Sequence, residues 1–113
     1  MRIKKSRKNL FSRFRKSKID IFVPHYPPKG VFDIIKDKGN PFRGRSAGIP
    51  IFTEAIRKFK PKLVLCGHMH EYQGAKRLGK SLVINPGEGD KGMYAVVDYQ
   101  ENKEKNIKIR FIK

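Results

Sequence analysis

The sequence predicts an α/β fold built on a mixed β-sheet with helices, and three observations support this prediction. Two apolar runs typical of buried strands, 19–23 and 63–65, are separated by a predicted helix over 50–59, and a strand–helix–strand unit favours parallel pairing. Three further apolar runs follow in close succession between residues 81 and 112, an order that favours an antiparallel meander. At 113 residues the chain is large enough for one modest domain.

The first predicted element is a short basic helix over 9–17. Its apolar residues recur at helical spacing and are Leu10, Phe11 and Phe14. We expect this face to pack against the core. The strand 19–23 follows, and the prolines of the segment 24–30 end it, because a proline has no N–H for a β-ladder. These prolines hold His25 at the end of the strand.

Residues 31–48 predict an ordered surface loop that is rich in glycine. Within it, Arg43 and Arg45 are candidate contacts to a phosphate group, and ordinary exposed arginines are the alternative. The helix over 50–59 then begins with a proline in its first turn and ends before Pro61. One apolar stripe predicts that this helix is part of the core.

After the strand 63–65, residues 71–80 predict a polar turn region. Three strands follow, over 81–85, 92–98 and 105–112, with a turn over 100–104 between the last two. The last strand alternates cleanly between apolar and basic residues, which is typical of a strand with one buried face.

The net charge of +17 is unevenly distributed along the chain. Residues 1–18 hold nine Lys and Arg and no acidic residue, so we separate them as a basic leader and helix stub from a domain over 19–113. Such a balance favours polyanionic partners such as nucleic acid, phosphorylated small molecules or an anionic membrane surface. A lysine-rich surface without a polyanionic partner is the alternative.

The only cysteine, Cys66, excludes an internal disulfide and lies in an apolar strand, so we expect a buried thiol. No apolar run approaches the ~20 residues of a membrane span. The basic N-terminus is not followed by the apolar stretch of a secretory signal. A reducing, cytoplasmic location is therefore the expectation.

The segment Cys66-Gly67-His68-Met69-His70 directly follows the apolar strand 63–65. Side-chain direction alternates along a strand, so we expect both imidazoles to leave the strand end on the same side. Neutral imidazoles are good ligands for transition metals. In open α/β sheets, sites form at the carboxyl ends of the strands, where His25 also lies.

Read together, three segments resemble the calcineurin-like metallophosphoesterases. They are His25-Tyr26-Pro27-Pro28, Gly67-His68-Met69-His70 and Asn85-Pro86-Gly87, and in that family the corresponding segments occur in this order. The chain is most similar to the small prokaryotic and archaeal phosphodiesterases. The resemblance implies that the mixed sheet is the C-terminal half of an αββα sandwich with a dinuclear metal site.

By this resemblance, His25 and His68 bind one metal and His70 binds the other, the metals being Mn²⁺, Fe or Zn²⁺. Such a centre hydrolyses a phosphate ester. Tyr26, Asn85 and the loop arginines Arg43 and Arg45 are then expected to line the substrate side. A single Zn²⁺ held by three imidazoles, with one open position, is an alternative arrangement.

The resemblance is incomplete, because the Asp-x-His, Gly-Asp-x-x-Asp and Asn-His segments of the family's first half do not occur here. They supply the bridging carboxylate and a general acid, so we expect the chain alone to have little or no phosphodiesterase activity. Three hypotheses follow: an incomplete phosphoesterase, a non-catalytic nucleic-acid-binding module, or one half that associates with a separate N-terminal half or with itself. Exposed strand edges would favour association.

Overall fold

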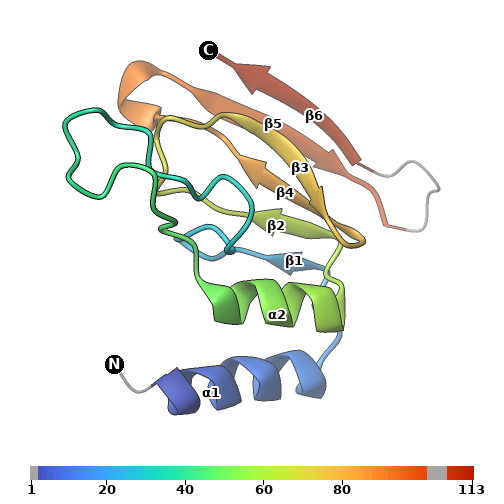
Figure 1. Ribbon diagram of the computed structural model, residues 1–113. Helices are drawn as coiled ribbons and strands as arrows, with labels where there is room; N and C mark the ends of the chain where they lie inside the picture. The colour runs from blue at the N-terminus through green and yellow to red at the C-terminus, as the bar shows by residue number, and fades with distance from the viewer. Residues whose placement is uncertain (1–2, 102–106) are drawn as a thin grey trace.

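Figure 1 shows the computed structural model, in which residues 3–101 and 107–113 are described. Within these residues a four-stranded sheet has the order β1-β2-β4-β3, and a separate hairpin pairs β5 with β6. The helices are α1 (Ile3–Lys16) and α2 (Pro50–Phe59). The strands are β1 (Ile21–Phe22), β2 (Leu63–Leu65), β3 (Gly74–Leu78), β4 (Ser81–Asn85), β5 (Tyr94–Tyr99) and β6 (Ile107–Ile112).

The predicted fold class is confirmed, because the sheet is mixed and flanked by helices. Strands β1, β2 and β4 are parallel neighbours, with Ile21 opposite Leu63 and Leu63 opposite Leu82. Strand β3 pairs with β4 in the antiparallel direction. The carboxyl ends of β1 and β2 therefore lie side by side. A site built from residues that follow these two strands requires this arrangement.

Both helices belong to one layer that covers one face of the sheet. Ile56 of α2 packs in a core cluster with Val64 and Val83 of the central strands. Phe11 and Phe14 of α1 form a second cluster with residues of α2 and β1. Because α1 packs beside α2, the apolar face predicted for the basic helix is indeed part of the core. The helix α2 has the predicted bounds, whereas α1 begins at Ile3, earlier than predicted.

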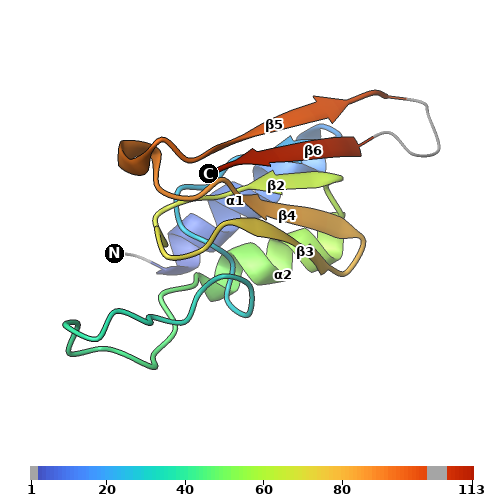
Figure 2. The same ribbon diagram turned by 90° about the horizontal axis from the view of Figure 1, so that it is seen from above.

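The hairpin of β5 and β6 lies on the opposite side of the sheet from α2 (Figure 2). Gln73, just before β3, ties it to the sheet by donating a hydrogen bond of 2.8 Å to the carbonyl of Ile112. Leu63 and Ile84 are buried on this second face, but Ile21 and Val23 remain 41% and 68% exposed. The hairpin therefore leaves the β1 side of this face open.

Two predictions about the later strands are wrong. Residues 74–78 were expected to be a polar turn but form β3, an edge strand held to β4 by its backbone although most of its side chains are exposed. The meander is also wrong, because β2 and β3 occupy both edges of β4, so β5 pairs only with β6. The predicted turn over 100–104 lies mostly outside the described residues, as does the start of the strand at 105.

No described helix has the length and apolar composition of a membrane span.

Candidate metal centre

Two histidines meet where neighbouring parallel strands end. His25 and His68 lie three residues beyond the ends of β1 and β2, and their ring centroids are 5.2 Å apart. The backbone also joins the two segments, because Gly67 donates a hydrogen bond of 2.9 Å to the carbonyl of His25. Tertiary structure thus brings together two histidines that are far apart in the sequence.

Tyr26 completes this aromatic group. Its ring centroid lies 4.3 Å from that of His68 and 5.1 Å from that of His25, and the residue is 40% exposed. The ring therefore supports both imidazoles from one side while part of it faces solvent.

The backbone at His68 is not the extended strand end that we predicted. His68 has a φ of 64°, in the left-handed region, and Met69 donates a hydrogen bond of 2.7 Å to the carbonyl of Gly67. Such a conformation costs a non-glycine residue about 1–3 kcal/mol and is common at functional sites. The turn buries Met69 between two exposed histidines, and both His68 and His70 line the same hollow.

The environment of His68 favours its neutral form, which is the form that binds a metal. Partial desolvation by neighbouring groups lowers the pKa of His68 although the residue is largely exposed, and positive charge on His25 or His70 would lower it further, whereas Glu71 acts in the opposite direction. Protonation consequently competes less with a metal at this imidazole than at an ordinary histidine.

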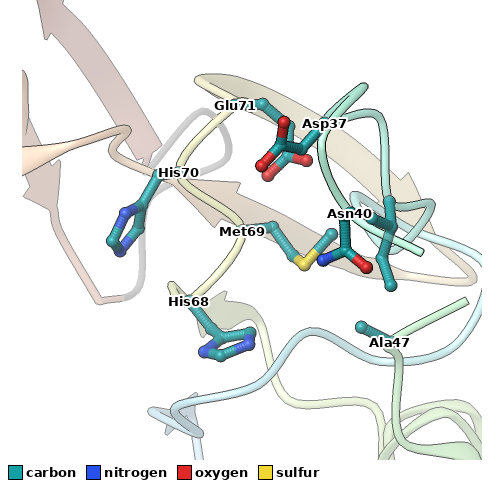
Figure 3. Close-up of a pocket in the computed structure, with 8 residues that line it drawn as sticks. Asp37, Asn40, Ala47, His68, Met69, His70 and Glu71 are labelled. Atoms are coloured by element: carbon teal, nitrogen blue, oxygen red, sulfur yellow. The ribbon is translucent and has the colours of Figure 1, made fainter. Parts of the chain in front are cut away.

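His70 has different neighbours from the other two histidines. Its Nδ1 lies 3.9 Å from a carboxylate oxygen of Glu88, and the other oxygen of Glu88 lies 3.3 Å from Nζ of Lys91. Figure 3 shows His68 and His70 on separate parts of the turn. His70 therefore lies beside other side chains than the pair His25 and His68 does.

A polar hollow of about 260 Å³ adjoins the histidine turn (Figure 3). The loop 31–48 forms its opposite wall, and the residues lining it are Ile35, Asp37, Asn40, Ala47, His68, Met69, His70 and Glu71. Two contacts hold the loop in place: Glu71 accepts a hydrogen bond of 3.2 Å from the Lys36 backbone, and the Tyr72 hydroxyl donates one of 2.9 Å to the carbonyl of Ile34. The loop is thus held in place, but its first residues differ from the predicted surface loop, because Val31 and Phe32 are buried in the core.

The loop residues that face the hollow are not the ones that the sequence indicated. Arg43 and Arg45 are exposed and do not line it, whereas Asp37 and Asn40 do. Asp37 and Asn40 also accept hydrogen bonds from backbone N–H groups two residues later, at Gly39 and Phe42. These turn-forming bonds explain why sequence reasoning assigned the segment to a loop and overlooked its carboxylate.

A second hollow of about 420 Å³ lies on the other side of His25 and is mainly apolar. Its lining comes from the ends of β1 and β2 and from the turn after β4: Val23, Pro24, His25, Leu65, Cys66, Gly67 and Pro86. The predicted buried thiol is confirmed, since Cys66 is 4% exposed and burial raises its pKa to about 11. Cys66 is therefore protonated at neutral pH and poorly suited to bind a metal or act as a nucleophile.

Asn85 connects two of the three sequence segments. It is 1% exposed, its side-chain amide donates a hydrogen bond of 3.0 Å to the carbonyl of Met69, and its side-chain oxygen accepts one of 3.0 Å from Gly87. Gly87 itself has a φ of 95°, and a Cβ there would lie 2.8 Å from the Met93 side chain. In this structure Asn85 holds the histidine turn against the Asn-Pro-Gly turn, and the predicted contact with a substrate remains a prediction.

Replacing Asn85 by alanine is expected to lower the free energy of unfolding by about 2–4 kcal/mol, because it leaves a buried carbonyl and a partly buried N–H without partners. Urea denaturation measures this loss. Asn9→Ala, on the exposed surface of α1, is the matched control and should change stability by less than about 0.5 kcal/mol. Equal effects of the two substitutions would contradict the bridging role of Asn85.

Residues 3–101 and 107–113 do not by themselves form a complete metal site. No three His, Cys, Asp or Glu side chains in this part of the chain come close enough together to hold a metal ion. The distance between the rings of His25 and His68 fits two imidazoles that share one ion, but a complete ligand set requires further groups.

The chain is similar to known proteins both in sequence and in fold. Residues 8–109 match the protein family described as metallophosphoesterase, calcineurin superfamily. A crystal structure similar to this chain has a TM-score of 0.57 and 26% identity, covering 80% of this chain and 32% of its own. The crystal structure of TT1561 from Thermus thermophilus has a TM-score of 0.55 and 24% identity, covering 91% of this chain and 38% of its own. The chain thus spans about a third of the length of these structures, and comparison with curated protein sequences gives no significant match.

Proposed function

This chain belongs to the calcineurin superfamily of metallophosphoesterases, and we propose that it supplies the histidine side of a metal centre that hydrolyses phosphate esters. The observation that carries this proposal is the meeting of His25 and His68 at the carboxyl ends of β1 and β2. Their two sequence segments are also among the three that resemble the family's motifs. Substrate, activity and partners of the whole enzyme all belong to the proposal, since the chain covers only a third of its structural neighbours.

In this proposal His25 and His68 bind one divalent ion, Mn²⁺, Fe or Zn²⁺, and His70 binds a second one. The separate surroundings of His70, beside Glu88, favour two sites over one site with three imidazoles. When bound, such metals supply a nucleophilic hydroxide and neutralise charge on the phosphate oxygens. No three suitable side chains come together among residues 3–101 and 107–113, so the proposed centre requires further ligands.

The residues around the histidines position them and face the substrate. Tyr26 supports both rings, and Asn85 fixes the turn that carries His68 and His70. We propose Tyr26 and the exposed loop arginines Arg43 and Arg45 as the substrate side. A contact of Asn85 with the substrate, which the resemblance also implies, would require the histidine turn to release this buried side chain. Neither arginine lines the polar hollow beside the histidine turn. To contact a phosphate, they therefore require the loop 31–48 to move or the substrate to extend beyond this hollow.

Association with a separate N-terminal half, or with a second copy, is the second candidate, and exposed apolar side chains favour it. Ile21 and Val23 on the open face of β1 are 41% and 68% exposed, and the apolar hollow beside His25 adjoins them. A partner that covered this face would bury apolar area and place new side chains beside His25. The free thiol of Cys66 is in keeping with a cytoplasmic setting for such an assembly.

Zn²⁺ titration followed by NMR of the histidine side chains tests the proposed pairing. We expect the resonances of His25 and His68 to shift together, because one ion contacts both rings, and His25→Gln to weaken this binding at least about tenfold. The matched control is His70→Gln, which should leave the joint shift of His25 and His68 in place. If His70→Gln abolishes it as His25→Gln does, a single three-imidazole site replaces the proposed arrangement.

A further inference from the structure

The outer surface of the helix layer carries a dense set of positive charges. Its exposed cations are Lys8, Arg13, Arg15, Lys16, Arg57, Lys58 and Lys60. We call this set the cationic helix surface. The acidic residues on the same elements are already occupied, because Glu54 pairs with Arg7 and Asp20 lies 4.0 Å from Lys18. The positive charge of this surface is therefore largely uncompensated within the described residues.

The two helices contribute to one continuous surface. Arg7 lies 4.3 Å from the centroid of the Phe11 ring, and Nζ of Lys58 lies 5.7 Å from the same centroid. Basic side chains of α1 and α2 thus lie over the same aromatic ring at the seam between the helices, where Arg7 is paired with Glu54 and Lys58 belongs to the cationic helix surface. Lys8 and Arg15 are seven residues apart and consequently lie on the same side of α1.

This surface is suited to a polyanion and not to insertion into a membrane. A helix that binds a lipid surface buries an apolar face between the headgroups. The apolar face of α1 is instead packed against α2, since Phe11 is 1% and Phe14 is 6% exposed. Only the charged face is available, and it acts through electrostatic attraction.

The surface also favours a double helix over a single strand. Proteins that bind single strands stack bases on exposed aromatic side chains. The large aromatic residues that are exposed in the described part of the chain are Tyr26, Phe42 and Tyr94, and none of them belongs to α1 or α2. A rigid pair of helices with basic side chains matches a regular array of backbone phosphates.

We propose that the cationic helix surface binds the phosphate backbone of double-helical nucleic acid without sequence specificity. None of its residues lines either hollow beside the histidines. The inference is thus independent of the phosphoesterase proposal, and a chain without any phosphoesterase activity would still show this binding.

Four substitutions on the surface test the inference in the full chain: Lys8→Gln, Arg15→Gln, Arg57→Gln and Lys58→Gln. We expect affinity for a 20-base-pair DNA or RNA duplex to fall at least about tenfold near physiological salt. The slope of log Kobs against log salt should decrease in magnitude by about 0.9 for each phosphate contact that is lost on DNA. Substitution is preferable to deletion of residues 1–18, because deletion also removes Phe11 and Phe14 from the core.

The matched control removes the same charge from exposed positions on strands and turns: Lys76→Gln, Arg77→Gln, Lys80→Gln and Lys108→Gln. This variant should keep most of the affinity and of the salt dependence, and circular dichroism should show both variants folded. Equal losses in the two variants would attribute binding to net charge alone and overturn the inference. No binding to either duplex, stronger binding to a single strand, or stronger binding to anionic vesicles would overturn it as well.

Discussion

Replacing Phe11 by alanine is expected to lower the free energy of unfolding by about 3–5 kcal/mol, as is typical of a buried aromatic residue. Phe11 is 1% exposed, and its ring packs edge-on against Phe59 with centroids 5.4 Å apart. Truncation leaves a cavity between α1 and α2 that the neighbouring Phe14 and Phe59, stacked on each other, fill only in part. Thermal or urea denaturation followed by circular dichroism measures the loss.

Arg15→Ala is the control for the Phe11 substitution, since Arg15 lies on the exposed side of the same helix and should change stability by less than about 0.5 kcal/mol. If Phe11→Ala unfolds the protein, Phe11→Leu supplies a milder measurement of the same contact. A loss below about 1 kcal/mol would mean that α1 is not part of the cooperative folding unit. That outcome would support the boundary at residue 18 that the charge distribution predicts.

The 113-residue chain by itself is expected to hydrolyse a bis-aryl phosphodiester in the presence of Mn²⁺ at least about 10³-fold more slowly than an intact member of the family. The described residues bring no third metal ligand to His25 and His68, so transition-state charge is poorly stabilised. Loss of even one well-placed stabilising group costs about 10²–10³ in rate. Release of the phenolate product, followed by absorbance, measures the rate.

His68→Ala is the control for residual turnover. A rate that is the same with and without this substitution comes from a contaminating phosphatase. Mn²⁺-dependent turnover close to that of an intact enzyme, abolished by His68→Ala, would contradict the expectation and show that this chain completes its own metal centre.

The elements of the fold that could be predicted are those whose burial leaves an apolar pattern in the sequence. The helix over 50–59 and the buried strands 63–65 and 81–85 have the predicted bounds, because burial on one or both faces imposes an apolar pattern on the sequence. Strand β3 lacks such a pattern, since an edge strand needs only backbone hydrogen bonds to β4. The separation of the β5–β6 hairpin from β4 likewise leaves no local pattern in the sequence. It depends on β2 and β3 already occupying both edges of β4.

The candidate site divides in a similar way. The three histidines stood out in the sequence because each follows an apolar strand in a distinctive segment. The left-handed turn at His68 did not, because its conformation is set by the hydrogen bonds of Gly67, Met69 and Asn85. Asp37 and Asn40 were overlooked because their side chains also form turns, and this role accounts for their residue types without reference to the hollow.

By itself the sequence determined the fold class, the placement of the histidines at strand ends and the excess of positive charge, since each depends on residue type and local spacing. Only the tertiary structure decided that His25 meets His68 while His70 faces Glu88, and that the cations of α1 and α2 share one surface. These outcomes depend on strand order and helix packing. Both are set by the burial of residues far apart in the chain, which no local pattern records.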